Sequence, residues 1–186
     1  MPGTGARDLP RMKSIEEAHS LLLRMGAPQR LVNHARLVGE AAELLLTELQ
    51  QLGVSHDADF VRVAVVLHDS GKILHPEELD GGGDKHERMG EMLLLAQGVD
   101  PALARCCISH AQWDQMQCSL EELIVALADT LWKGKRNASL EKRVIELISE
   151  RLGRAFWDLF IELDNNFETI AANSTTRLLR SQTKDM

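Results

Sequence analysis

The chain has 186 residues and a formal net charge of −7, with 28 acidic side chains against 21 Lys and Arg. Its length suits one globular domain that buries a core without disulfides, and its three cysteines form no CxxC motif. The acidic balance argues against a general nucleic-acid surface. No apolar run is long enough to span a membrane, and the amino-terminal segment lacks the apolar core of a signal peptide. These features predict a cytoplasmic protein.

The first half of the chain is predicted to begin with a flexible leader over residues 1–13, which contains Gly and two Pro. Apolar residues then recur at helical spacing in segments that a capping residue or Gly delimits, namely 14–25, 31–52 and 58–69. A loop over residues 75–83 follows, because Pro76 and a Gly-Gly-Gly run interrupt the helical pattern.

The second half is also predicted to be helical throughout. The expected helices cover residues 84–97, 101–112, 119–133, 139–153 and 154–172. Ser119 and Glu122 have capping-box spacing, and Ser139 is the expected cap of the fourth of these helices. No segment reads as a strand, so the predicted fold class is all-α, with one domain over residues 14–174 and a tail over residues 175–186.

Ionisable side chains stand in two segments that are otherwise apolar. The stretch LIVALADTLW around Asp129 is apolar on every face except for this carboxylate and a Thr, and VAVVL runs directly into His68-Asp69. A buried carboxylate is costly unless it is paired or binds a metal. His34 lies on an apolar stretch of the preceding helix, and imidazole with carboxylate suits Zn, Fe, Mn and similar ions.

Each of these residues also has a simpler interpretation when it is considered alone. His34 is compatible with a hydrogen-bonded core histidine, and Asp129 with an ion pair to Lys133 at i+4. A plain helical interaction domain without metal leaves the carboxylate in the apolar helix unexplained. The three signals in this order therefore favour a metal site.

The order His34, His68-Asp69 and Asp129 resembles the H…HD…D signature of the HD superfamily of metal-dependent phosphohydrolases. The surrounding text VVLHDSGK and ALADTLWKGKR is also similar to that family, over residues 31–136. The resemblance implies a helical bundle around a metal site that is formed by these four residues. It also implies hydrolysis of a phosphate ester or anhydride, often in a nucleotide, by metal-activated water.

Two further histidines match the pattern of the family members that hold two metals. His86 and His110 extend the series to H…HD…H…H…D, in which Asp69 would bridge both ions and take part in catalysis. The simpler alternatives are a solvated His86 in a charged first turn and a His110 that meets a helix dipole. The resemblance thus implies one or two divalent transition-metal ions, such as Fe, Mn or Zn.

Basic residues near the motif are the candidates for contacts with phosphate. Members with HDxxK use that lysine, here Lys72, near the substrate, and Lys133 and Arg136 follow the last aspartate of the motif. For each of them a solvated basic turn is the alternative. Lys72 is also assigned a catalytic role, because it would neutralise phosphate charge in the transition state.

Among HD proteins, the bacterial symmetrical dinucleoside tetraphosphatases have a similar arrangement, including the HxxxG of His86–Gly90 and an arginine at Arg136. The segment Ala111–Trp113 departs from their pattern. The chain lacks both a GYP tripeptide and HDxxED, which weakens two other specificities of the superfamily. The alternatives are a one-metal nucleotidase and a non-catalytic HD module that binds a nucleotide for signalling. A small phosphorylated substrate is expected, and an oligomer is possible.

Overall fold

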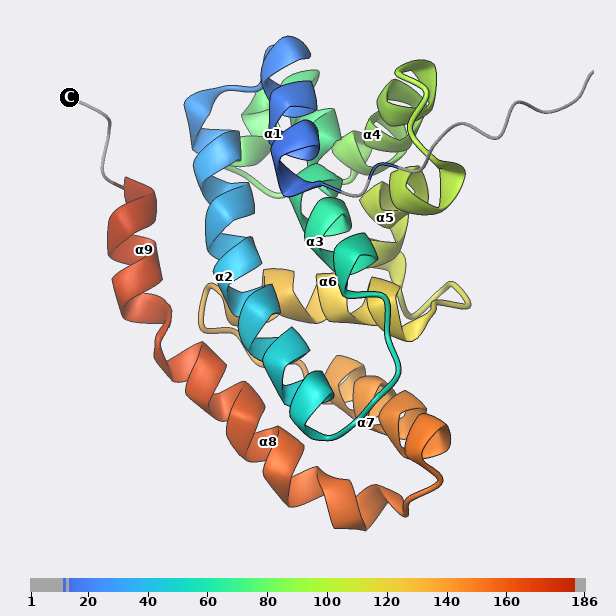
Figure 1. Ribbon diagram of the computed structural model, residues 1–186. Helices are drawn as coiled ribbons and strands as arrows, with labels where there is room; N and C mark the ends of the chain where they lie inside the picture. The colour runs from blue at the N-terminus through green and yellow to red at the C-terminus, as the bar shows by residue number, and fades with distance from the viewer. Residues whose placement is uncertain (1–11, 13, 183–186) are drawn as a thin grey trace, which may run out of the picture.

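A computed structural model describes residue 12 and residues 14–182, and this part of the chain is all-α with no strand (Figure 1). The predicted leader over residues 1–13 lies outside the described residues except for Met12. The helices in chain order are α1 Ile15–Arg24, α2 Gln29–Gln51, α3 Ala58–Leu67, α4 Lys85–Ala96, α5 Pro101–Gln112, α6 Leu120–Leu131, α7 Ala138–Leu152, α8 Phe156–Ala172 and α9 Ser174–Gln182. Two short 3-10 helices, η1 Ser70–Ile73 and η2 Pro76–Leu79, lie between α3 and α4.

Side-chain caps explain where several helices begin. The predicted capping box at α6 is present, because Ser119 accepts a hydrogen bond from the Glu122 amide and the Glu122 carboxylate accepts one from the Ser119 amide. Ser14 likewise caps α1. The cap of α7 is Asn137 and not Ser139, because Asn137 Oδ1 accepts from the Leu140 amide at 3.1 Å.

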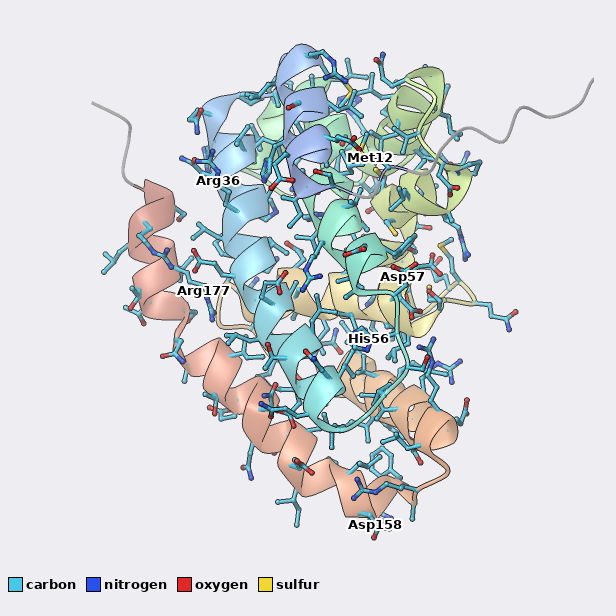
Figure 2. All side chains as sticks on the ribbon, in the orientation of Figure 1. Met12, Arg36, His56, Asp57, Asp158 and Arg177 are labelled. Atoms are coloured by element: carbon cyan, nitrogen blue, oxygen red, sulfur yellow. The ribbon has the colours of Figure 1, made fainter. Side chains whose placement is uncertain are left out.

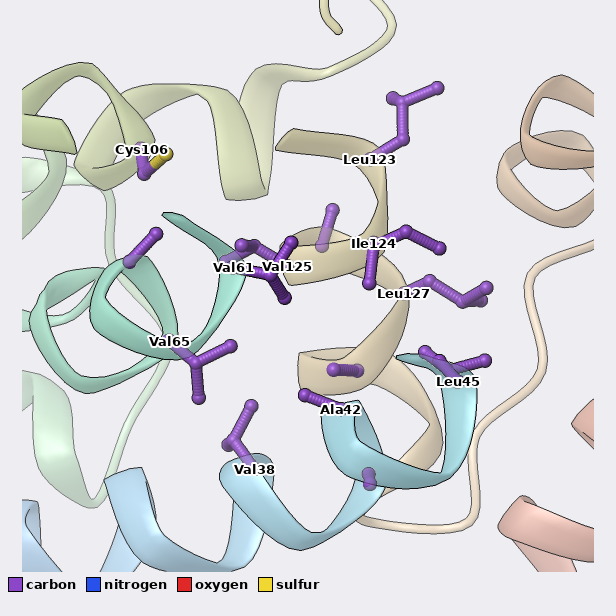
Figure 3. Packing of buried hydrophobic residues seen from close by; sticks show 14 of the residues in the cluster. Val38, Ala42, Leu45, Val61, Val65, Cys106, Leu123, Ile124, Val125 and Leu127 are labelled. Atoms are coloured by element: carbon purple, nitrogen blue, oxygen red, sulfur yellow. The ribbon is translucent and has the colours of Figure 1, made fainter. Parts of the chain in front are cut away.

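The core is organised around α6, which lies in the middle of the bundle and contacts α2, α3, α5 and α7 (Figure 1). Its apolar side chains face all these neighbours, as the sequence LIVALA predicts. Figure 3 shows Val125 of α6 next to Val61 of α3, and Leu127 of α6 on the side of Leu45 of α2. The centre of the bundle is thus formed by the same helices that carry the His and Asp residues of the predicted motif.

The segment after α3 approaches α4 very closely. A Cβ atom at Gly71 would lie only 1.8 Å from the main-chain oxygen of His86, and one at Gly90 would lie 2.9 Å from Cys107 Sγ. Both positions therefore require Gly, because any side chain there would push α4 away from η1. This contact brings the start of α4 next to His68 and Asp69.

The carboxyl-terminal residues differ from the predicted tail over residues 175–186, because residues 174–182 form the helix α9. The Arg180 guanidinium pairs with the Glu40 carboxylate of α2 at 2.6 Å. The buried Arg177 donates to the main-chain oxygen of Ile170 at 2.8 Å and lies between α9 and α2 (Figure 2). These tertiary contacts hold a segment whose own sequence is mostly polar.

Smaller differences occur around the motif. The helix predicted over residues 58–69 ends at Leu67, and the loop predicted over residues 75–83 contains the 3-10 helix η2. Across the part of the chain that the structure describes, no helix combines the length and the apolar character that a membrane span requires.

Candidate metal centre

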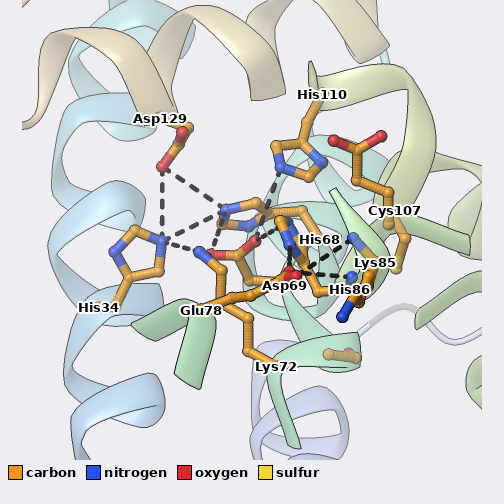
Figure 4. Close-up of polar contacts among 12 residues, drawn as sticks. His34, His68, Asp69, Lys72, Glu78, Lys85, His86, Cys107, His110 and Asp129 are labelled. Carbon is orange, nitrogen blue, oxygen red and sulfur yellow. Dashed lines mark hydrogen bonds and ion pairs between the residues drawn. The ribbon is translucent and has the colours of Figure 1, made fainter. Parts of the chain in front are cut away.

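The six predicted ligand residues come together in one cluster (Figure 4). They come from different parts of the bundle. His34 lies on α2, His68 follows the last residue of α3, and Asp69 directly precedes η1. His86 lies in the first turn of α4, His110 in the last turn of α5 and Asp129 in the last turn of α6. Helix ends and first or last turns thus supply all of them except His34.

His34, His68 and Asp129 offer ligand atoms close enough to share one ion, and Asp69 Oδ2 lies beside the two histidines. His34 Nε2 lies 3.1 Å from Asp69 Oδ2, 3.4 Å from Asp129 Oδ1 and 3.4 Å from His68 Nε2. His68 Nε2 lies 3.6 Å from each of the same two carboxylate oxygens. Ligands about 2.1 Å from a tetrahedral ion are roughly 3.4 Å apart, so these spacings fit a transition metal.

A second group uses the other oxygen of Asp69. Asp69 Oδ1 lies 3.2 Å from His86 Nε2 and 3.6 Å from His110 Nε2. Both Asp69 Oδ1 and His86 Nε2 are buried without a hydrogen-bond partner among the described residues. A carboxylate oxygen and an imidazole nitrogen that face each other are satisfied either by a proton on the nitrogen or by a divalent metal between them.

Hydrogen bonds on the far side of the rings fix three of the histidines. The Nδ1 of His68 lies 2.7 Å from the main-chain oxygen of Val65, and that of His110 lies 3.0 Å from the oxygen of Cys106. A carbonyl only accepts, so Nδ1 carries the proton and the Nε2 lone pair faces the cluster. Metal-binding histidines are commonly oriented in this way.

The third of these histidines has a carboxylate partner that the sequence analysis missed. His86 Nδ1 lies 2.6 Å from Oε2 of Glu78, which belongs to η2 and is buried. The segment PEELDGGGD looks solvated because it is acidic and rich in Gly. The one feature of the sequence that could have indicated this role is the position of Glu78, a short loop before a candidate ligand histidine.

The charges of the cluster favour a cation. Burial alone would raise the pKa of Asp69, but His68, His34 and His86 outweigh it and hold this pKa well below its ordinary value. The pKa of Asp129 is lowered in the same way by His68, His34 and Lys133. Burial lowers the pKa of His110 to about 4, so its imidazole is neutral near pH 7. Two ionised carboxylates and a neutral imidazole form a suitable ligand set.

The three predicted phosphate contacts divide into two groups. Lys72 Nζ lies 2.6 Å from Asp69 Oδ2, and Lys133 Nζ lies 3.2 Å from Asp129 Oδ2, so both ammonium groups border the cluster. Arg136 makes its described contacts elsewhere. Its guanidinium bonds to the carboxylates of three residues of α7 and α8, namely Glu141, Asp164 and Glu168. The structure thus brings both lysines, but not this arginine, to the metal ligands.

Comparisons with known proteins identify the family. Residues 31–132 match the family model described as HD domain, and this range includes all six predicted ligand residues. An uncharacterized protein of Methanocaldococcus jannaschii is 28% identical over 154 residues, which cover 75% of this chain and 86% of that protein. No solved structure matches the chain significantly.

Proposed function

This chain belongs to the HD domain family, and we propose that it is a phosphohydrolase that holds two metal ions and cleaves a phosphate ester or anhydride of a nucleotide-like substrate with water. The observation that carries the proposal is the Asp69 carboxylate. Its Oδ2 faces His34 and His68, whereas its Oδ1 faces His86 and His110. A carboxylate with each oxygen in a separate histidine group is the arrangement expected of a bridging ligand.

The ligand set supports Fe, Mn, Zn or a similar ion, because it combines imidazole nitrogens with carboxylate oxygens. When bound, such ions act as Lewis acids towards phosphoryl oxygens and lower the pKa of water towards neutrality. His34, His68, Asp69 and Asp129 would hold the first ion, and Asp69, His86 and His110 the second.

The remaining residues of the site bind substrate and move a proton. The Lys72 and Lys133 ammonium groups border the carboxylates at 2.6 and 3.2 Å, where they would meet phosphate oxygens and stabilise charge that develops on them. Asp69 would accept the proton of the attacking water or only orient that water. Water is the nucleophile because burial raises the pKa of the Cys106 and Cys107 thiols, so neither supplies a thiolate.

The test begins with the full chain purified without chelators or a nickel column. Elemental analysis is expected to find more than one equivalent of transition metal per chain after loading. Hydrolysis with Mn, Fe or Zn is then measured as inorganic phosphate released from nucleoside phosphates and as nucleoside diphosphate formed from symmetrical dinucleoside tetraphosphates. Hydrolysis with a single ion would support the one-metal nucleotidase instead. Tight nucleotide binding without hydrolysis under every loading would support the non-catalytic signalling module.

The position of bond cleavage gives a second measurement. Hydrolysis in ¹⁸O-labelled water should place the label on the phosphate that is released, because water attacks phosphorus. A label on the sugar oxygen, or an intermediate covalently attached to the chain in a rapid quench, would rule out the proposed attack by water.

A further inference from the structure

Glu78 connects the 3-10 helix η2 to the start of α4. Its carboxylate is only 7% exposed. Oε1 accepts from the Lys85 amide at 3.3 Å, and Oε2 accepts from the His86 amide at 3.1 Å. Oε2 also lies 2.6 Å from Nδ1 of the His86 ring (Figure 4). One buried side chain thus satisfies three donors at the beginning of one helix.

This carboxylate replaces the usual cap of α4. Asp84 occupies the N-cap position but makes no capping hydrogen bond through its side chain. Main-chain amides at the start of the helix donate to the Glu78 carboxylate instead. The neighbouring Gly83 leaves room for this contact, since a Cβ there would lie 2.3 Å from Glu78 Oε1. Both oxygens of the Glu78 carboxylate therefore face N–H donors, two from the main chain and one from the His86 ring.

We propose that Glu78 is a positioning residue that keeps His86 in the Nδ1–H tautomer and thereby supports the second of the two ions. Glu78 Oε2 lies 2.6 Å from Nδ1, closer than Asp69 Oδ1 lies to Nε2 at 3.2 Å, so the ring proton stays on Nδ1 and the Nε2 lone pair faces the cluster. The proposal rests on the two-ion function proposed above.

The effect is specific to the second group of ligands. His68 and His110 are oriented by main-chain oxygens, which no side-chain substitution removes. His86 instead depends on a carboxylate, which also makes the imidazole a stronger donor to metal than a carbonyl partner does. A change at Glu78 therefore reaches His86 and leaves the His34, His68 and Asp129 group in place.

The variant that separates these roles is Glu78→Gln. Gln is neutral, so in either orientation its amide accepts from His86 Nδ1 more weakly than the carboxylate or not at all, and a proton on His86 Nε2 beside the Asp69 carboxylate becomes favoured. Calorimetric titration of metal-free protein with Mn²⁺ should show the first ion bound as in wild type and the second bound about 10–100-fold more weakly. The matched control is Glu77→Gln, because Glu77 is an exposed neighbour whose carboxylate contacts His75 instead. Wild-type affinity for both ions in Glu78→Gln would overturn the proposal.

The tautomer itself is measured by ¹⁵N NMR of the metal-free wild-type chain at alkaline pH, with the His86 signals assigned by their loss in His86→Ala. The expected result is a proton on Nδ1, and Glu78→Gln should move it to Nε2. A wild-type proton on Nε2 would overturn the proposal, even if the Gln variant does not fold. This measurement needs neither ion nor substrate, so it is independent of whether the chain hydrolyses phosphate.

Discussion

Replacing Gly71 with Ala tests whether the close approach of η1 and α4 sets the metal centre. The added Cβ would lie 1.8 Å from the His86 main-chain oxygen and 2.7 Å from the Gly90 amide nitrogen. Contacts of a Cβ below 3.0 Å essentially do not occur, so the start of α4 must retreat by about 1.2 Å or more. The atoms that bind a metal must stay within about 0.5 Å of their productive positions. The displacement is thus large enough to take His86 away from Asp69.

Two quantities should change in Gly71→Ala. Overpacking at this contact should lower the free energy of unfolding by about 1–3 kcal/mol, as measured by urea denaturation. Metal content after loading should fall by about one ion, because His86 belongs to the second group only. The control is Gly39→Ala within α2, where an added Cβ meets nothing within 4 Å. That substitution should raise stability by about 0.5–1 kcal/mol. Wild-type stability and metal content in Gly71→Ala would refute the reasoning.

Four other changes probe the site and its surroundings. Asp69→Ala should abolish hydrolysis and weaken the binding of both ions. Near-wild-type turnover would show that Asp69 is not a ligand. Lys72→Met should lower kcat about 10²–10³-fold at unchanged metal content; a loss of metal instead would assign the lysine a structural role. Arg136→Ala should cost about 1–3 kcal/mol in urea denaturation, because the buried Glu141 carboxylate loses its guanidinium partner and keeps only the hydrogen bond from the Asn137 amide. A lower kcat/KM with an unchanged free energy of unfolding would instead support the predicted role of Arg136 in substrate binding. Loading with Mn²⁺ at 100 times its Kd should add about 2.7 kcal/mol of stability, and a melting temperature that chelator does not lower would contradict the metal site.

The residues of the cluster could be predicted to lie together because the sequence places them where packing alone would not. Asp129 interrupts a helix that is apolar on every face, and His68-Asp69 follows the buried VAVVL segment. The helices themselves were predictable from apolar periodicity and from caps such as Ser119. Where two good caps lie close together, as with Asn137 and Ser139, local sequence does not decide between them, and the structure uses the first.

The residues that could not be predicted depend on contacts between segments far apart in the chain. Glu78 lies in an acidic, Gly-rich loop, and only the packing of η2 against α4 buries it. Arg136 follows the motif closely, yet the return of α8 supplies it with carboxylates 28 and 32 positions later. The segment 174–182 is mostly polar, and its position against α2 depends on pairs such as Arg180 with Glu40. Periodicity and motif spacing contain no information about such partners.

The central position of α6 has a consequence for the order in which the protein matures during synthesis. Five of the six ligand residues precede α6 in the chain, and they leave the ribosome before Asp129 does. Until α6 inserts among α2, α3 and α5, these helices lack the apolar partner that fills the middle of the bundle. Closure of the core and completion of the proposed first ligand set therefore both depend on α6, and a nascent chain that ends before α6 has neither.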